Sequence, residues 1–332
     1  MNSWTPDGES GKKFITPICP VDYELPNGNR LFMKRDDLLP FSFGGNKVRI
    51  SECFLRDMKR KKKDLMIGYG NSRSNLCRTL ANLCFSAGVP VWIVSPDDDD
   101  GSRSRSFNSA LVTDCFHARV IPCSKNAVSA AVQKALDEAA EQGYDPYYIN
   151  GNCFGCGNEA VPVRAYADVY SEMTAQSAAM DCAFDHIVVT VGTGMTLAGL
   201  VCGREMSLRN GEAPAPGILG VSIARGRERA LNSTGKYISA YLQDTPLQRS
   251  YEIIENFGDG YGRYDRETDR LIEDVLAKTG IALDPNYTGK GFGGMLRFIR
   301  DKGIRESDIL FIHTGGLPLF FDSLREKDDG KR

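Results

Sequence analysis

The sequence lacks the features that mark several classes of protein. Its 332 residues contain no uninterrupted apolar run long enough to span a bilayer, and the polar segment 1–13 has no apolar core of the kind that a signal peptide needs. The net charge is only −2, which gives no support for a nucleic-acid or membrane-surface partner. No internal repeat and no low-complexity linker is visible. We therefore expect a globular protein of one large or two moderate domains.

Histidine is also scarce, and its placement does not predict a metal site. The chain has three histidines, none of them in an H-E-x-x-H motif. His186 and His313 lie in strand-like runs, which is typical of core histidines. The single C-x-x-C, Cys153 to Cys156, has no second cysteine pair or histidine pair at zinc spacing. We expect no bound metal and interpret Cys153 and Cys156 as incidental thiols, although a redox role stays open.

Cysteine, by contrast, is abundant. Ten are present, and several lie in apolar or helical patterns that suit buried, reduced thiols. Since no secretory signal is visible, the sequence predicts a location in the cytoplasm.

Apolar runs alternate with amphipathic segments along the chain, which predicts an α/β fold with mostly parallel twisted sheets flanked by helices. Ile50, Phe54 and Met58 form the stripe of one helix. The expected strands lie near 31–33, 64–68, 91–94, 119–121, 147–149, 186–191, 219–223 and 309–312. The other expected helices lie near 76–87, 107–116, 127–142, 160–179, 196–207, 268–278 and 293–302.

A lysine follows two glycines and an asparagine where one of these helices begins. In the segment Phe43–Lys47, the amine of Lys47 would lie on a tight turn at the positive end of a helix, and both that position and burial lower an ammonium pKa. A lysine with a lowered pKa is a nucleophile suited to Schiff-base chemistry. Since glycine-asparagine turns that feed helices are common, a merely solvated lysine is the alternative.

The glycine-rich turn 191–199 joins an expected strand to an expected helix. Backbone donors, small side chains and the helix dipole make it a candidate phosphate site. It does not fit the dinucleotide pattern G-x-G-x-x-G, because position 197 is leucine. We therefore favour one phosphate monoester over a pyrophosphate, with a turn needed only for packing as the alternative.

Two further turns lie at expected strand ends. The segment 68–75 is rich in glycine, serine and asparagine, and it opens a helix, which suits a carboxylate. The segment 312–318 places Thr314 before two glycines, where a flat ring could approach closely. One amine nucleophile, one phosphate cradle and one carboxylate site together describe pyridoxal 5′-phosphate with an amino-acid substrate.

With these motifs in order, the chain resembles the fold-type II (tryptophan synthase β-like) pyridoxal-phosphate enzymes. Within them it is most similar to the D-cysteine desulfhydrase / 1-aminocyclopropane-1-carboxylate deaminase family. The matching segments lie between residues 30 and 320: Lys34-Arg35-Asp36-Asp37, Phe43 to Lys47, Ser74-Asn75, Thr193-Gly194-Met195-Thr196, Ala198-Gly199, Gly260-Tyr261-Gly262, Asp284 to Tyr287, Gly289-Lys290, and His313 to Gly316.

The resemblance implies a role for each motif. Lys47 would hold the cofactor as a Schiff base and move the Cα proton, and Asn75 would hydrogen-bond the pyridoxal 3-oxygen. Ser74 would contact the substrate carboxylate or reacting group. Tyr261 and Tyr287 would lie near the substrate. The phosphate would be bound by Gly192, Thr193, Gly194, Met195 and Thr196.

Several positions depart from the family pattern and bear on the substrate. Arg73 adds a fixed cation beside the proposed carboxylate site, where glutamine is usual, and 152–156 replaces a Ser-Asp-His-Pro loop. Ile50 occupies a position that is often basic. Thr288 replaces an acidic residue, and Thr314 would present a neutral hydroxyl to the pyridine nitrogen. A ring without a carboxylate partner would stay largely unprotonated there, which suits β-elimination or β-replacement better than cyclopropane opening.

The expected activity is a lyase reaction on a small amino acid with a β leaving group, giving a 2-oxo acid and ammonia. Alternatives are a β-replacement synthase, a 1-aminocyclopropane-1-carboxylate deaminase, a nucleotide-dependent oxidoreductase that uses the turn 192–199, or a protein that has lost its chemistry. The resemblance implies a homodimer. It also implies a large cofactor-binding domain (1–49 plus 161–332) and a small domain (50–160), with the cofactor in the cleft between them.

Overall fold

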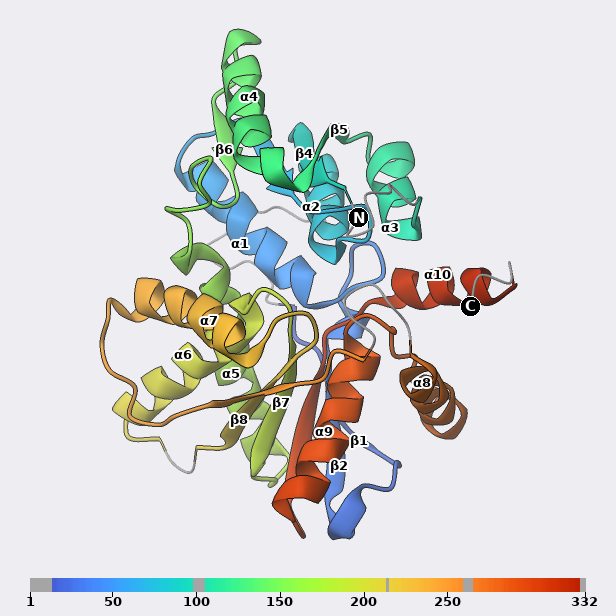
Figure 1. Ribbon diagram of the computed structural model, residues 1–332. Coiled ribbons are helices and arrows are strands. Elements are labelled where there is room, and N and C mark those ends of the chain that lie inside the picture. Colours follow the sequence, from blue (N-terminus) through green and yellow to red (C-terminus); the bar gives the residue numbers. More distant parts are fainter. Residues whose placement is uncertain (1–13, 98–104, 213–214, 259–264, 329–332) are drawn as a thin grey trace, which may run out of the picture. The chain divides into compact units, whose positions relative to one another are not determined.

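The computed structural model describes residues 14–97, 105–212, 215–258 and 265–328 (Figure 1). The chain divides into two compact units. The smaller contains Leu39–Ser42 and Lys47–Asn158 together with the chain up to Thr16, and the larger contains Pro17–Leu38, Phe43–Asn46 and the chain from Glu159 onward. The domain bounds predicted from the sequence stay a prediction.

The larger unit contains a six-stranded sheet in the order β1-β2-β10-β7-β8-β9. Every neighbouring pair is parallel except β1 with β2, so the sheet is mixed at one edge only. Its strands are β1 (Ile18–Val21), β2 (Arg30–Arg35), β7 (His186–Val191), β8 (Gly217–Ser222), β9 (Glu252–Glu255) and β10 (Asp308–His313). The carboxyl ends of β2, β7 and β10, where the proposed motifs follow, therefore meet at one edge of this sheet.

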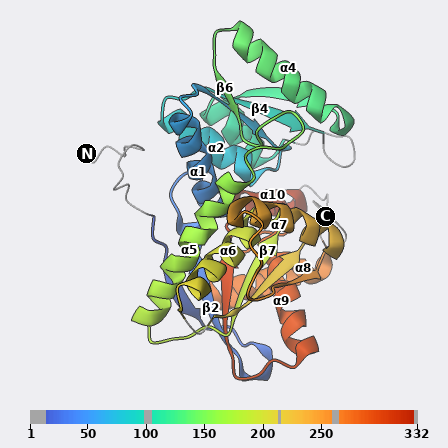
Figure 2. The same cartoon turned by 90° about the vertical axis from the view of Figure 1, so that its left-hand side faces the viewer.

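Two groups of helices flank this sheet (Figures 1 and 2). The first group packs together and consists of α5 (Ala160–Ala179), α6 (Met195–Arg209) and α7 (Arg227–Leu242). The second contains α8 (Arg266–Thr279) and α9 (Thr288–Lys302), and α10 (Leu317–Asp328) follows β10. Phe292 of α9 packs edge-on against Phe311 of β10 in the buried core. Burial of such apolar surface is the main stabilising term for this unit.

The smaller unit contains a four-stranded, wholly parallel sheet in the order β5-β4-β3-β6. Its strands are β3 (Leu65–Tyr69), β4 (Val91–Pro96), β5 (Arg119–Cys123) and β6 (Pro146–Tyr148). Its helices are α1 (Asn46–Arg60), whose first residue the division assigns to the larger unit, α2 (Asn75–Ser86), α3 (Phe107–Ala110) and α4 (Val128–Glu141). A π-helical turn, Leu111–Cys115, continues α3.

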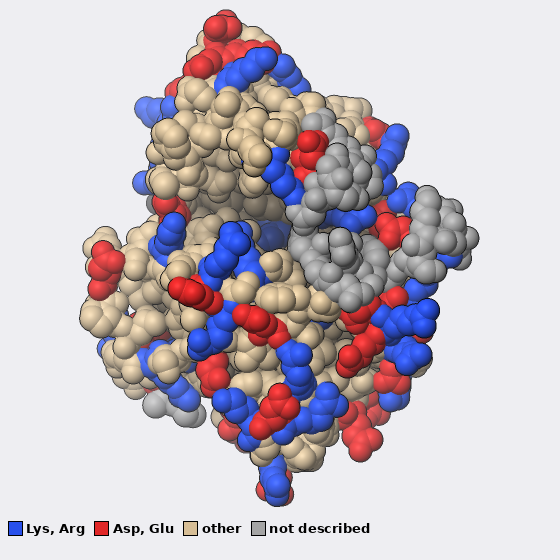
Figure 3. All heavy atoms as spheres, viewed as in Figure 1, with Lys and Arg blue, Asp and Glu red and all other residues tan. Residues whose placement is uncertain are grey.

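The predicted α/β fold with two helix-flanked sheets is confirmed. The sequence missed the edge strands β1 and β9 and the helices α7 and α10. All ten cysteines are free, and four are buried. Acidic and basic side chains are interspersed over the face shown in Figure 3, in keeping with the small net charge. Within the described residues, none of the helices has the length and apolar character needed to cross a membrane.

Candidate active site

Asn46, the residue before the lysine, joins three of the predicted motifs within the larger unit. Its backbone N–H donates to the Thr314 carbonyl (3.1 Å), and its side-chain Nδ2 donates to Thr196 Oγ1 (2.8 Å). Gly45 lies against the same turn, because a Cβ added to it would be 2.8 Å from the Thr314 oxygen. A side chain at Gly45 would therefore push the turns apart. The contacts fix the start of α1, and with it the attachment point of Lys47.

The amine of Lys47 is desolvated. Although part of the side chain remains exposed, burial lowers the pKa of the Lys47 ammonium from 10.5 to about 8. Among the described residues, no carboxylate forms an ion pair with it. At neutral pH this pKa raises the neutral, nucleophilic fraction roughly 300-fold over that of an ordinary lysine. The chain thus places a reactive amine at the position that the sequence singled out.

The low pKa of Lys47 predicts how folding stability and the reactivity of this amine depend on pH in protein prepared without the cofactor. Because the folded pKa lies below the unfolded value, folding is disfavoured by this group below about pH 8. That penalty disappears as the pH rises toward 10.5, the model value. We expect reductive methylation of Lys47, followed by mass spectrometry, to rise with a midpoint near pH 8. Exposed Lys134 serves as the reference; identical profiles for the two lysines would contradict the assignment.

The turn after β7 offers unpaired backbone donors. Gly194, with φ +100°, precedes α6 and provides no side-chain cap, and the first helical hydrogen bond runs from Ala198 N–H to the Gly194 carbonyl (2.8 Å). The amides of residues 195–197 therefore have no acceptor within the helix. Thr196 Oγ1 accepts from Asn46, which leaves its hydroxyl hydrogen to donate elsewhere. This arrangement matches a bound phosphate.

Helix α7 adds two residues to this turn that sequence reasoning missed. Ser233 Oγ donates to the Thr193 carbonyl (2.7 Å) and accepts from Arg225 Nη1 (2.9 Å). Thr234 is fully buried, and its hydroxyl has no hydrogen-bond partner among the described residues. A Cβ on Gly194 would lie 2.7 Å from Thr234 Oγ1. An unsatisfied buried hydroxyl beside a row of free amides indicates that a ligand completes this part of the site.

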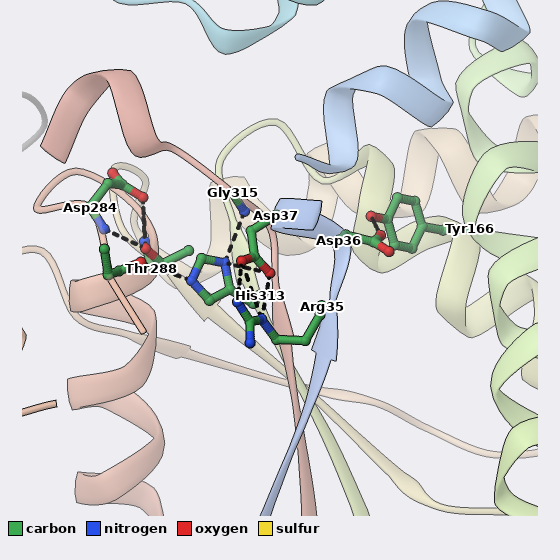
Figure 4. Close-up of polar contacts among 9 residues, drawn as sticks. Arg35, Asp36, Asp37, Tyr166, Asp284, Thr288, His313 and Gly315 are labelled. Carbon is green, nitrogen blue, oxygen red and sulfur yellow. Dashed lines mark hydrogen bonds and ion pairs between the residues drawn. The ribbon is translucent and has the colours of Figure 1, made fainter. Parts of the chain in front are cut away.

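Tyr287 is positioned by a buried carboxylate. Asp284 accepts hydrogen bonds from the backbone N–H groups of Asn286 and Tyr287. It also accepts from the backbone N–H and the hydroxyl (2.8 Å) of Thr288 (Figure 4). Burial raises the pKa of Asp284, and the hydrogen bonds that it accepts act in the opposite direction. Tyr287 lies beside the phosphate turn, because Tyr287 Cε1 is 3.6 Å from a Cβ built on Gly192. The hydroxyl of Thr288 also accepts from the Asp284 backbone N–H (2.7 Å), so it is engaged within the turn that carries Tyr287.

The turn after β10 is stabilised by hydrogen bonds to the side chain of His313. Gly315 N–H donates to His313 Nδ1 (3.2 Å), so His313 Nε2 carries the hydrogen and donates to the Ala282 carbonyl (2.9 Å). Asp37 Oδ1 lies 3.7 Å from His313 Nδ1, and the Asp37 carboxylate accepts a bidentate hydrogen bond from Arg35 (Figure 4). His313 is buried, as predicted, whereas His186 is only half-buried.

Thr314, which follows His313, is the residue predicted to face the pyridine ring. Thr314 is 8% exposed, and in the described part of the chain no group hydrogen-bonds to its hydroxyl. A neutral hydroxyl is therefore available at the position where the sequence placed the pyridine nitrogen.

The smaller unit holds the other predicted residues at the start of α2. Ser74 caps the helix by accepting from Cys77 N–H (3.2 Å). Asn75 Oδ1 accepts from Asn108 Nδ2 (3.0 Å) and from Arg78 Nη2 (3.3 Å). Because two donors fix the oxygen, the Asn75 Nδ2 group is oriented and, among the described residues, has no acceptor. Asn108 also donates to the Arg73 carbonyl (3.0 Å), which ties Arg73 to the same network.

The predicted residues thus form two sets, each described within its own unit. The larger unit brings together Gly192, Thr193, Gly194, Met195, Thr196, Tyr287 and Thr314. The smaller unit contains Lys47, Arg73, Ser74 and Asn75. Tyr261 lies outside the described residues. Asn46, Asn108 and Thr234 were not predicted as site residues. In the sequence, the only indication of their role is that each is a polar residue in or near a region that forms the site.

Comparison with known proteins identifies the class. The family model for pyridoxal-phosphate dependent enzymes matches residues 11–315, and the chain belongs to this family. It is 31% identical over 325 residues to the D-cysteine desulfhydrase of Klebsiella pneumoniae subsp. pneumoniae, covering 93% of this chain and 94% of that protein. The predicted family and its cofactor, pyridoxal 5′-phosphate, are therefore confirmed.

Solved structures agree with this assignment. A structure described as an ACC deaminase homologue superposes with a TM-score of 0.78 at 27% identity, covering 94% of both chains. A hydrogen sulfide-producing enzyme of Fusobacterium nucleatum superposes with a TM-score of 0.63 at 17% identity, covering 90% of this chain and 94% of that chain, and shows the fold alone.

The residues present fit the cofactor. Unpaired amides of the turn before α6 and the orphaned Thr234 hydroxyl suit its phosphate, the free hydroxyl of Thr314 suits a ring nitrogen, and the Lys47 amine suits its aldehyde carbon. The sequence left open a nucleotide-dependent oxidoreductase. Such an enzyme uses a different cofactor, so the family assignment argues against this alternative.

Proposed function

We propose that the protein is a lyase that removes a β substituent from a small amino acid and releases a 2-oxo acid and ammonia. The similarity to D-cysteine desulfhydrase over 93% of the chain supports the reaction class. The observation that carries the choice of elimination is the neutral hydroxyl of Thr314, with the neighbouring candidate position, Thr288, occupied by a threonine bound to Asp284.

The pyridoxal group, when bound, supplies an electron sink for the pair left at Cα when its proton departs. Lys47 would hold the group through its amine and, once released from it, carry the Cα proton on Nζ. Asn75 Nδ2 would donate to the ring 3-oxygen, and Thr196 Oγ1 and the amides of 195–197 would donate to the phosphate. Thr314 would present an uncharged hydroxyl to the ring nitrogen.

The substrate carboxylate would lie at the start of α2, where Ser74 and the helix dipole favour an anion. Arg73 would add a positive charge to that position. Tyr287, and Tyr261 by family resemblance, would lie near the substrate. Loss of H–X across Cα and Cβ leaves an enamine, and water converts it to a 2-oxo acid and ammonia, so that no external oxidant or reductant is needed.

The test is release of 2-oxo acid from D- and L-cysteine, serine and their β-substituted analogues. We expect 2-oxo acid and one equivalent of ammonia from at least one thiol or hydroxyl substrate. Added thiol or amine nucleophiles should leave that yield unchanged. Capture of the β carbon by the added nucleophile would instead show a replacement synthase. Ring opening of 1-aminocyclopropane-1-carboxylate at a comparable rate would overturn the role assigned to Thr314.

We also propose that the protein acts in the cytoplasm as a homodimer. Ten free thiols suit a reducing compartment. Family resemblance supports the dimer. Sedimentation equilibrium at micromolar concentration tests the dimer, and a monomer under those conditions would refute it.

A further inference from the structure

A cavity of about 270 Å³, partly open to solvent, lies within the smaller unit beside the proposed carboxylate site. Its polar end is formed by the turn after β3, from Gly70 to Ser72, together with Ser74. Since one water needs only about 10–15 Å³ of such space, the cavity exceeds the needs of a thiol or hydroxyl many times over. The side chain of cysteine or serine would therefore fill only a small part of this cavity.

The walls of the cavity come from neighbouring strands on one face of the sheet. Ile93 pairs in register with Val120, and Ser95 pairs with Pro122, and all four line the cavity. Ile121, between the two on β5, does not line it. Successive side chains of a strand point to opposite faces of the sheet. Val120 therefore points toward the cavity and its neighbour Ile121 points away from it, which makes Ile121 a suitable control position.

Apart from Arg105, the described residues that line the cavity are uncharged, and its surface is largely apolar. Val112 and Pro96 complete the apolar wall, and burial raises the pKa of Cys77 to about 12, so its thiol stays neutral. Arg105, the charged residue among the described lining side chains, forms an ion pair with Asp114. An ammonium group in the cavity would meet no carboxylate among these lining residues, whereas an alkyl or aryl group would be well accommodated.

We infer that this cavity binds the β substituent of the substrate and that the natural substrate class is amino acids with an extended, uncharged β substituent, such as S-alkyl or S-aryl cysteines. The inference rests on the proposed function, because that function places the substrate carboxylate at Ser74. An amino acid with its carboxylate at the start of α2 would direct its side chain into the adjoining cavity. Elimination would then break the Cβ–S bond: Lys47 Nζ takes the Cα proton and passes it to the leaving thiolate, so that the substituent is released as a thiol, R–SH.

Binding without turnover tests the inference separately from catalysis. Norleucine and alanine have no β leaving group, so their affinities for the cofactor-loaded enzyme can be measured by calorimetry, with both enantiomers. Each buried methylene contributes about fourfold in affinity, so we expect norleucine to bind at least tenfold more tightly than alanine. Val120→Phe should cancel this preference, and the matched variant Ile121→Phe should keep it.

Turnover gives the second measurement. For S-propylcysteine relative to cysteine, the ratio of kcat/KM values should fall at least tenfold in Val120→Phe and stay within about twofold in Ile121→Phe. Thr113→Phe, which fills the cavity from its helical wall, replaces Val120→Phe if that variant does not fold. Equal binding of norleucine and alanine, or equal effects of the two β5 variants, would overturn the inference. Cavity-dependent binding without 2-oxo acid release would support the cavity and refute the proposed elimination.

Discussion

Replacing Lys47 with alanine should lower kcat for 2-oxo acid release by at least about 10³-fold, because the chain loses both the covalent anchor of the cofactor and the group proposed to carry the Cα proton. The visible absorption band of the covalently held cofactor should disappear. The low pKa of this amine is the basis of the expectation, since a permanently charged lysine could do neither. Steady-state kinetics and the absorption spectrum of the purified protein measure both effects.

The control is Lys134→Ala, which removes an exposed lysine from α4 and should change neither measurement. Two results would refute the role of Lys47. One is full activity in Lys47→Ala, and the other is a colourless wild-type protein that takes up no added pyridoxal phosphate. The second result would also favour a protein that keeps the fold without the chemistry.

Gly194→Ala should weaken pyridoxal phosphate binding roughly 100-fold. Its φ of +100° is unfavourable for alanine, and the new Cβ would lie 2.7 Å from Thr234 Oγ1 in the phosphate turn. Relief of that clash would move the amides of residues 195–197 away from their ligand. The dissociation constant is measured by fluorescence titration with pyridoxal phosphate, and again with pyridoxal, which lacks the phosphate and should be much less affected.

Gly211→Ala separates backbone strain from the effect on the site. Gly211 also has a positive φ, +79°, but an added Cβ there meets nothing within 4 Å, and it lies just beyond the other end of the same helix. We expect both variants to lose thermal stability, Gly194→Ala more because of its clash with Thr234, and only Gly194→Ala to lose phosphate affinity. Equal affinities in the two variants would show that the turn does not bind the phosphate.

The fold could be predicted from the sequence where apolar periodicity is strong, as in β7 and α5. Helix α7 was missed although Ala230, Thr234, Ile238 and Leu242 are buried at four-residue spacing. The stretch 232–235, Asn-Ser-Thr-Gly, has the composition of a turn, and packing against α6 overrides that local preference. Edge strands β1 and β9 have only four residues each, too few to show a period.

The candidate site divides in the same way. Residues with special chemistry, such as Lys47 and the glycines of the turn 191–199, could be proposed from the sequence because their types and spacing are unusual. Asn46, Asn108 and Thr234 could not, since their importance lies in contacts with residues 33 to 268 positions away. Thr288 shows the converse: its difference from the family pattern suggested a role in substrate choice, whereas its hydroxyl is bound to Asp284.

The contacts of Asn46 have a consequence for the kinetics of cofactor uptake. Because Asn46 joins the lysine turn, Thr196 and Thr314 through hydrogen bonds made by the protein alone, this part of the site needs little ordering when the cofactor binds. Preorganisation of this kind lowers the entropic cost of association, so capture should follow the collision step without a slow rearrangement of these three turns.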